Sequence, residues 1–320
     1  MRYVFRRLIH TLFLLVGVSI LSFLFARLAP GDYFEQMRLN PQLSQEAVAS
    51  LRVKYGLNQP LPIRYIHWVR SVLRGEFGFS FAYNTPVGPL IRARAGNTLL
   101  LTGTATLLAW LLAIPLGIWA AARKGRWPDT VLGVGTTALL ATPDLLLALL
   151  LLLLAVRTGW FPTGGMQVQN ISQLNWWRKV EDFASHLFLP ALCLVLGALP
   201  TLIRHVRAAL IEVLDSPFIR AARGHGIPRW RLLTRHALPA AANPLISLFG
   251  FSVGTLLSGS LLIEVVMSWP GIGPMLLEAI LARDLYLVIG AVMFSTFFLV
   301  GGNLLADLLL YVADPRIRAE

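Results

Sequence analysis

Six long apolar runs constrain the fold of this chain more than any other feature of its sequence. A helix needs about 20 apolar residues to cross roughly 30 Å of bilayer hydrocarbon. Hydrophobic residues form 56% of the chain and charged residues only 14%, a balance unlike that of a globular protein. We therefore expect an all-α membrane protein with about six transmembrane helices. The runs lie near Leu8 to Leu28, Leu99 to Ala122, Val131 to Val156, Leu187 to Ile203, Leu245 to Met267 and Leu285 to Val312.

Basic residues flank these runs in a pattern that predicts their orientation. Arginine and lysine clusters precede the first run, separate the second from the third, fill the segment between the fourth and fifth, and end the chain. Short cytoplasmic loops carry such an excess, so both termini are predicted to lie on the cytoplasmic side of the cytoplasmic (inner) membrane. The net charge of +12 then reflects topology and contact with anionic membrane lipid, and we expect no nucleic-acid partner.

Two runs need comment before the chain is divided. The fourth is short and carries Pro190 and Pro200, which a membrane helix tolerates only with local rearrangement. The first is long for a cleaved signal, so we expect it to be retained. The expected segments are a first transmembrane helix at 1–29, an external segment with an amphipathic helix at 30–97, a five-helix transmembrane core at 98–314 that includes a cytoplasmic insert at 215–239, and a cytoplasmic tail at 315–320.

The prediction of an amphipathic helix in the external segment is based on the spacing of four residues. Tyr65, Trp68, Val69 and Val72 recur at helical spacing. Tryptophan and tyrosine favour the headgroup level of a bilayer. The helix is therefore expected either to lie in the membrane interface or to pack under a partner.

The insert between the fourth and fifth runs reads as two short basic helices. Ser216 can cap a helix whose first residue is Pro217, and Gly226 can end it in the left-handed conformation. Pro228 can then start the next turn before Pro239 stops it. The first of these helices should be about 9 residues, roughly 13 Å, in length.

The expected helix after Ser216 has two different sides. Phe218, Ala221 and Ala222 should share one side, and Arg220 and Arg223 should lie on the other. Small alanines would let the backbone of a partner come close, so the insert is predicted to be a docking surface. The alternative is a cytoplasmic loop that only carries the arginine excess.

The insert resembles the EAA loop of binding-protein-dependent ABC importer permeases, the segment of those proteins that docks onto the ATPase. That motif has two alanines, a glycine four positions on and a later Leu-Pro pair. These places are held here by Ala221, Ala222, Gly226, Leu238 and Pro239. Arg220 stands where the motif commonly has an acidic residue.

Three other strings extend this resemblance over nearly the whole chain. YGLNQPLPIRYIHW with RGEFGFS, SWPGIG with EAILARD, and the closing NLLADLLLYVADPRIR look like parts of dipeptide, oligopeptide and nickel importer permeases. The resemblance implies a type I importer permease architecture and transport of di- or oligopeptides. It also implies a second homologous permease, two subunits that bind ATP and Mg, and an external substrate-binding protein. No cofactor is implied on this chain.

Some residues inside the runs are candidates for the transport pathway. Acidic residues in a membrane need partners or water, so they are expected either to line a peptide path or to pair internally. The WPGIG turn should be rigid, with proline fixing φ and glycines allowing positive values, and is either a gate or a helix connector. These candidates are Asp144, Glu264, Trp269, Pro270, Gly271 and Asp307.

A stripe of small residues marks the fifth run. Gly250, Gly254 and Ser258 recur at four-residue spacing, which permits close helix packing in a membrane. The contact is expected either within the chain or at the seam with a second permease subunit.

Residue patterns for enzymatic chemistry are missing from the sequence. None of the lysines Lys54, Lys124 and Lys179 follows glycine and precedes serine or threonine, as a phosphate-binding loop requires. The single cysteine, Cys193, excludes an intrachain disulfide and a cysteine-based metal site. We therefore expect no enzyme and no metal on this chain. Alternatives to peptide import are a nickel, opine or glutathione permease of the same family, or a gradient-driven secondary transporter.

Overall fold

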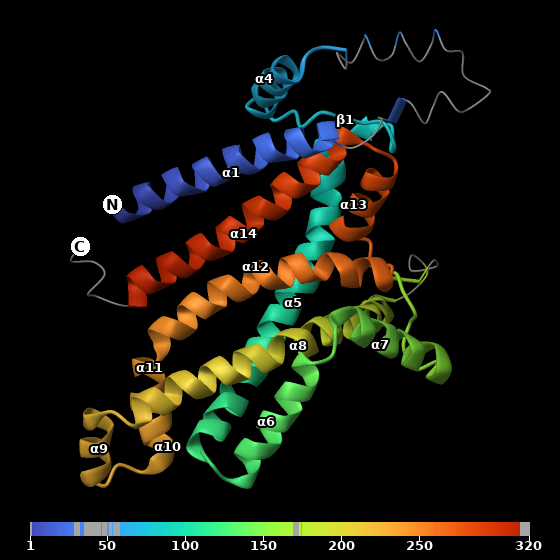
Figure 1. Ribbon diagram of the computed structural model, residues 1–320. Helices are drawn as coiled ribbons and strands as arrows, with labels where there is room; N and C mark the ends of the chain where they lie inside the picture. Colours follow the sequence, from blue (N-terminus) through green and yellow to red (C-terminus); the bar gives the residue numbers. More distant parts are fainter. Residues whose placement is uncertain are drawn as a thin grey trace. The chain divides into compact units, whose positions relative to one another are not determined.

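The computed structural model describes residues 2–28, 33–34, 46, 50, 53, 58–168, 173 and 175–313. These residues form helices joined by short turns, with one small hairpin (Figure 1). The predicted tail at 315–320 lies outside them. In chain order the elements are α1 (Arg2–Leu28), α4 (Leu61–Val72), β1 (Phe79–Ser80), β2 (Thr85–Pro86), α5 (Val87–Ala122), α6 (Trp127–Leu140), α7 (Asp144–Thr158), α8 (Trp176–Leu214), α9 (Pro217–Gly224), α10 (Arg229–Arg231), the π-helix η2 (Leu232–Ala237), α11 (Leu238–Ala240), α12 (Ala242–Val266), α13 (Ile272–Leu281) and α14 (Leu285–Ala313).

The chain divides into two compact units, each made of segments that are distant in sequence. The first unit combines Met1–Thr98 with Pro270–Phe298, and the second combines Leu99–Trp269 with Leu299–Glu320. Helices α5 and α14 therefore contribute one end to each unit. The residues of the insert, the acidic candidates and the small-residue stripe all belong to the second unit.

The described helices confirm a multi-span α-helical protein. Four of them, α5, α8, α12 and α14, are long and apolar enough to cross a membrane. Helices α6 and α7 pass the same test together and raise the number of candidate spans to five. The expected first span corresponds to α1, a continuous helix that contains the apolar stretch Ile9–Phe25.

The third predicted run, Val131 to Val156, does not form one continuous helix. Helix α6 ends at Leu140, α7 begins at Asp144, and the two are bent by 95°. Pro143 adopts an extended conformation, with φ −59° and ψ 140°. Because proline lacks an N–H and disfavours the helical conformation of the residue before it, the ladder stops at this point. Asp144 therefore stands at the start of a new helix.

Helix α8 is much longer than the fourth apolar run from which it was predicted. It contains 39 residues and continues through Pro190 and Pro200, both of which are buried. A helix of that length extends about 58 Å, well beyond the roughly 30 Å of a bilayer core. Its far end, at Leu214, leads directly into the insert.

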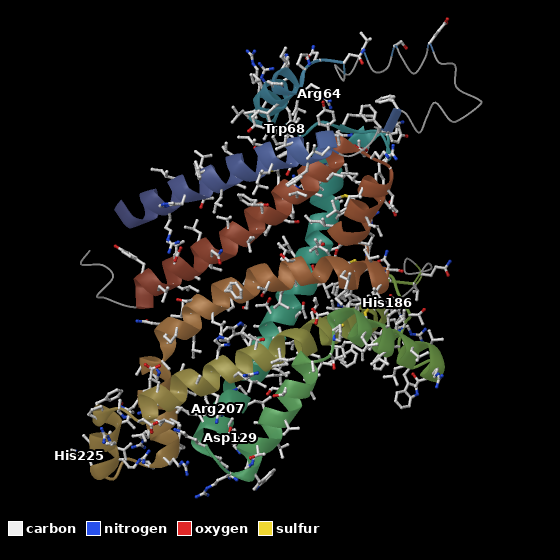
Figure 2. All side chains as sticks on the ribbon, in the orientation of Figure 1. Arg64, Trp68, Asp129, His186, Arg207 and His225 are labelled. Carbon is white, nitrogen blue, oxygen red and sulfur yellow. The ribbon has the colours of Figure 1, made fainter. Side chains whose placement is uncertain are left out.

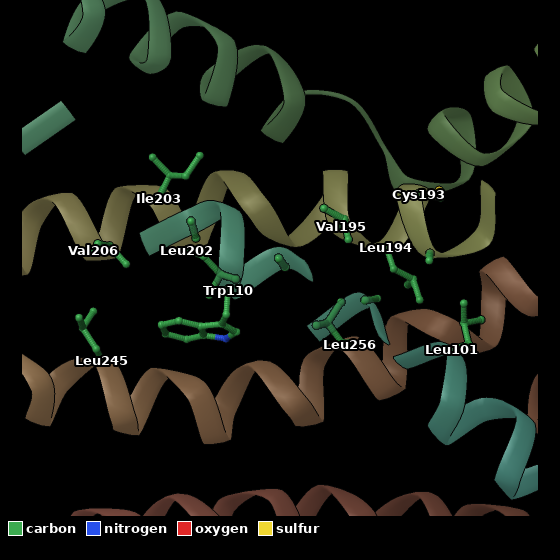
Figure 3. Close-up of a cluster of buried hydrophobic side chains, with 14 of the residues drawn as sticks. Leu101, Trp110, Cys193, Leu194, Val195, Leu202, Ile203, Val206, Leu245 and Leu256 are labelled. Carbon is green, nitrogen blue, oxygen red and sulfur yellow. The ribbon is translucent and has the colours of Figure 1, made fainter. Parts of the chain in front are cut away.

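Close packing of α5, α8 and α12 forms the core of the second unit (Figure 3). Ala105, Ala109 and Ala113 of α5 are fully buried. Trp110, between them, donates a hydrogen bond from Nε1 to the hydroxyl of Ser252 at 2.9 Å. Small residues let these helices approach, and the tryptophan fills the remaining space without leaving its N–H unpaired.

In the first unit, α4 packs on α1. Trp68 of α4 forms a buried cluster with Phe23 and Ile289. The hydroxyls of Tyr65 and Ser19 are 2.9 Å apart. The predicted helix is therefore present, and the side bearing Tyr65 and Trp68 is covered by residues of the chain itself rather than left for the membrane interface or a partner.

A buried carboxylate joins the β1–β2 hairpin to the start of α14. Asp284 is fully buried and accepts hydrogen bonds from the hydroxyl of Ser80 at 2.7 Å and from the amide of Ala82 at 3.0 Å. Its second oxygen accepts from the amide of Leu287 at 3.3 Å, in the first turn of α14. Sequence analysis did not single out this residue.

Candidate functional site

The insert folds into a short helix followed by irregular turns. Helix α9 begins at Pro217, as predicted, and has eight residues. Gly226 has φ +75°, which confirms the predicted left-handed conformation. Ser216 occupies the N-cap position, but its hydroxyl makes no capping hydrogen bond and is buried without a partner in the described structure. The predicted cap by the Ser216 side chain is therefore wrong; the fixed φ of Pro217 is suited to the first helical position without it.

The apolar residues of α9 are divided between an inward and an outward face. Ile219, which sequence analysis missed, is fully buried and joins the core of the second unit, where Ala222 packs against it. Phe218 is 52% exposed, and Ala221 is exposed with it. The three residues predicted to share one side, Phe218, Ala221 and Ala222, therefore differ in burial, because Ala222 is half-buried against the core. Arg220 and Arg223 are exposed.

The helical turns after α9 end close to the predicted position. Helix α10 follows Pro228, and η2 and α11 carry the chain through Leu238 and Pro239 to Ala240. Ala240 comes one residue after Pro239, which was predicted to stop the helix. Leu238 packs against the core and Pro239 is exposed.

The outer surface of the insert is basic and partly aromatic. Residues 216–239 contain no acidic side chain. Trp230 is 62% exposed, and the guanidinium of Arg231 lies 5.8 Å from its ring centroid. Such a surface suits a partner that offers carboxylates around an apolar groove. The exposed arginines are Arg220, Arg223, Arg229, Arg231 and Arg235.

Two ion pairs connect the start of α6 and the turn before it to the end of α8 that leads into α9. Arg207 of α8 binds Asp129 of α6 through two parallel hydrogen bonds, from Nε at 2.5 Å and from Nη2 at 2.8 Å (Figure 2). Asp129 also accepts a hydrogen bond from the amide of Gly125. Lys124 and Asp215 form a second pair at 3.2 Å. The bidentate and mostly buried pair is the stronger restraint, because exposed pairs contribute little.

The WPGIG turn lies where one unit ends and the other begins. Trp269, in the second unit, is fully buried and its amide donates to the carbonyl of Glu264 at 2.8 Å. In the first unit, Pro270 accepts from the side chain of Asn97 at 2.8 Å. The glycines do not use the positive φ that is open to them: Gly271 has φ −97°, and the positive angle, 52°, falls on Ser268. Gly271 caps α13 with extended backbone instead.

The acidic candidates do not gather at one place. Asp144 begins α7 and lines a cavity beside α8 and α12, and neither Glu264 nor Asp307 is among the described residues that line it. Glu264 is fully buried in α12, and Asp307 is half-buried in α14. Of the three acidic candidates, Asp144 is the one that lines this cavity among the described residues.

The small-residue stripe of α12 packs against α14 within the second unit. A Cβ added at Gly250 would overlap Ala306 and stand 3.1 Å from the carbonyl oxygen of Gly302, and one added at Gly254 would overlap Leu299. Ser258 is exposed, and its hydroxyl donates to the carbonyl of Gly254. Gly250 and Gly254 therefore form an internal contact.

Comparison with known proteins finds family models and relatives that match this chain. A family model described as "Binding-protein-dependent transport system inner membrane component" matches residues 113–319, and one for the N-terminal part of such membrane components matches residues 1–102. The chain is 36% identical to the oligopeptide transport system permease protein AppB of Bacillus subtilis, over 98% of each chain. It is 31% identical to the glutathione transport system permease protein GsiC of Salmonella choleraesuis, over 99% of each.

A solved structure shares the fold. A chain of the MetNI methionine ABC transporter, in an inward-facing conformation, superposes with a TM-score of 0.52 at 16% identity, over 70% of this chain and 96% of that chain. The expected permease fold and the multi-pass location in the cytoplasmic (inner) membrane are confirmed. The helices, the insert and the full-length similarity together show that the chain belongs to the family of inner-membrane components of binding-protein-dependent transport systems.

Proposed function

We propose that this chain is a permease subunit that moves di- or oligopeptides into the cell, driven by ATP hydrolysis on separate subunits. It would pair with a second homologous permease, stand on two ATP-binding subunits that hold ATP and Mg, and receive substrate from an external binding protein. The names of relatives such as AppB favour peptide as the substrate. Similarity to GsiC keeps glutathione import as the second candidate.

The observation that carries the proposal is the construction of α9. Its outer face presents Phe218 and Ala221 among arginines, and its inner face is anchored by the fully buried Ile219. An ATPase that binds the outer face can therefore move the whole helix rather than a loose loop. Sequence positions that resemble the EAA loop, Gly226 among them, lie in the same insert.

Movement of α9 would reach the membrane through α8. The two helices are separated only by Asp215 and Ser216, and α8 packs along α6, α7 and α12. The Asp129–Arg207 pair makes α6 follow α8 instead of sliding past it. Closure of two ATPase subunits would thus tilt a group of helices together and alternate access to the substrate. With α9 on the cytoplasmic side, both chain termini would also be cytoplasmic.

Affinity purification tests the assembly. The tagged chain is solubilised gently from native membranes, and the proteins that accompany it are identified by mass spectrometry. Recovery of a second permease with ATP-binding subunits is expected. Recovery of the chain alone, or as a homo-oligomer without an ATPase, would favour a gradient-driven transporter instead.

A matched pair of variants tests the coupling role of the insert. Gly226→Asp forces a side chain into the left-handed conformation, at about 1–2 kcal/mol, whereas Gly224→Asp adds the same side chain two residues earlier in α9. An added Cβ meets nothing within 4 Å at either position. Substrate-driven ATP hydrolysis by the reconstituted complex should fall about tenfold for Gly226→Asp and much less for Gly224→Asp. Unchanged hydrolysis in both would show that α9 does not transmit the movement.

A further inference from the structure

A cavity of about 220 Å³ lies within the second unit, between the start of α7 and the facing sides of α8 and α12. Gly197 and Thr201 of α8 line it opposite Ser252 and Thr255 of α12, and Asp144 closes one side. Gly197 is near the middle of the 39-residue α8, and Thr255 is near the middle of the 25-residue α12. Because both helices are candidate spans, the cavity lies near the middle of the bilayer, the depth at which transporters hold their substrates.

Asp144 is the only charged side chain among the described residues that line this cavity. Within the described chain its carboxylate has no hydrogen-bond or ion-pair partner, although α7 continues as an apolar helix. An ionisable group at such a depth ordinarily pairs with another group or faces water or a ligand. The carboxylate of Asp144 is therefore suited to bind a cation.

The backbone of α8 is shaped to receive this carboxylate. An added Cβ at Gly197 would stand 2.9 Å from Oδ1 of Asp144, so the glycine lets the carboxylate lie against α8 without moving. Asp144 is exposed in the described chain and borders the cavity.

Two hydroxyl groups of the cavity, those of Ser252 and Thr255, are better acceptors than donors. The hydroxyl of Ser252 donates to the carbonyl of Phe249, and that of Thr255 donates to the carbonyl of Ser252. Both protons are therefore in use, and oxygen lone pairs remain. Oxygen acceptors beside a carboxylate match an ammonium group, which offers three N–H donors and no acceptor. The rest of the lining is mainly apolar and weakens screening by water; it includes Leu194, Leu202, Leu248, Phe251, Leu256 and Ile263.

We propose that this cavity binds the N-terminal ammonium group of a peptide, with Asp144 as the counter-ion and Thr255 as a neighbouring acceptor. The proposal rests on the peptide permease function proposed above and identifies the end of the substrate that this chain holds. The cavity is smaller than the roughly 300–1,000 Å³ typical of sites that enclose a whole ligand. It therefore takes the first residue of the peptide and leaves the remainder to the rest of the pathway.

The chain contains a residue, Cys193, whose labelling can report the charge of this cavity. Cys193 is its only cysteine, and it lines the same cavity. In native membranes, Cys193 is labelled with two methanethiosulfonate reagents of similar size, one bearing a trimethylammonium group and the other a sulfonate, and labelling is followed by mass spectrometry. The ratio of the cationic rate to the anionic rate reports the charge of the cavity. Changes in thiol reactivity alter both rates and cancel in the ratio.

Asp144→Asn should lower this ratio at least about fivefold, because it removes the one negative charge of the lining. Gly197→Ala keeps that charge but displaces the carboxylate, and should also lower the ratio. Glu212→Gln, an exposed change elsewhere on α8, is the control and should leave the ratio unchanged. A dipeptide with a free N-terminus should slow labelling of the wild-type chain more than its N-acetylated form does.

Each contrary result overturns a distinct step. Because Cys193 is buried, the ratio is also measured on Ala198→Cys, a half-buried position of the same lining. No labelling at either position would show that the cavity is closed to ligands. An equal ratio in wild type and Asp144→Asn would remove the cation site. A ratio that depends on Asp144, with no difference between the two dipeptides, would overturn the assignment to a peptide terminus. None of these results depends on which subunits co-purify, so failure here is distinguishable from failure of the proposed importer assembly.

Discussion

Replacing Gly302 with alanine should destabilise the second unit, whereas the same change at the neighbouring Gly301 should not. A Cβ at Gly302 would stand 2.9 Å from Cγ1 and 3.1 Å from Cβ of Val253 on α12. A Cβ at Gly301 would meet nothing within 4 Å. Both positions lie inside α14, so the two variants share the gain in helix propensity of about 1 kcal/mol that alanine has over glycine.

The size of the effect follows from the overlap. Carbon atoms pack at about 3.5–4.0 Å, so α12 and α14 must separate by roughly 0.5–1 Å or Val253 must leave its rotamer. Valine has essentially one good χ1 rotamer in a helix, so the helices should move. Such overpacking costs about 1–3 kcal/mol. At about 2–4 °C per kcal/mol, the apparent Tm of Gly302→Ala should fall several degrees below that of Gly301→Ala.

The assay is thermal unfolding of the purified chain in detergent, followed by tryptophan fluorescence at one scan rate for both variants. The pair also separates the two interpretations of the Gly250–Gly254 stripe. If these glycines served a seam with a second permease and not α14, the isolated chain would not distinguish Gly301→Ala from Gly302→Ala. Equal Tm values would therefore refute the internal packing described here.

Three other changes have expected outcomes. Burial and a hydrogen bond to Glu278 raise the pKa of Tyr83 to about 12; because the unfolded pKa is about 10, the stability this tyrosine adds is complete below pH 10 and is lost as the pH approaches 12. The difference in tyrosinate absorbance between wild type and Tyr83→Phe should show a step near pH 12, and a step near 10 would contradict the hydrogen bond to Glu278. Asp284→Ala leaves the donors of Ser80 and Ala82 without an acceptor, so unfolding of the first unit should become easier by about 2–4 kcal/mol, seen as faster limited proteolysis at the hairpin; Asp284→Asn should lose less. Trp110→Phe keeps an aromatic ring but removes the indole N–H that bonds Ser252 and some buried volume, so stability should fall by at least about 1 kcal/mol; an unchanged Tm would show that neither the bond nor the filled volume matters.

Prediction of the insert succeeded for the start of α9 and the conformation of Gly226, and it missed the burial of Ile219. The conformation of Gly226 and the start at Pro217 follow from local rules, because only φ preferences and missing N–H groups are involved. The orientation of Ile219 does not, since helical spacing groups residues into sides but does not say which side meets the core. A buried isoleucine beside an exposed phenylalanine is decided by what α8 and η2 present to them.

Among the acidic residues, too, features with a local sequence signal could be predicted and contacts between distant residues could not. Hydropathy marked Asp144 as an intramembrane acid, but the break at Pro143 that places it at the head of α7 was overlooked. That break had a local signal in the proline itself. The partners of Asp129 and Asp284 had none, because Arg207 is 78 residues from the first and Ser80 is 204 residues from the second.

The sequence by itself therefore determined that the chain lies in a membrane, the class of its fold and its family. The signals for these properties are the length of the apolar runs, the chemistry of proline and glycine, and the spacing of motifs, all of which act within a few turns of chain. Only the tertiary structure decided that Gly250 and Gly254 meet α14 and that Asp144 faces Gly197 across a cavity. Contacts of this kind depend on the packing of several helices at once, at distances where one missing methyl group decides whether two backbones can approach.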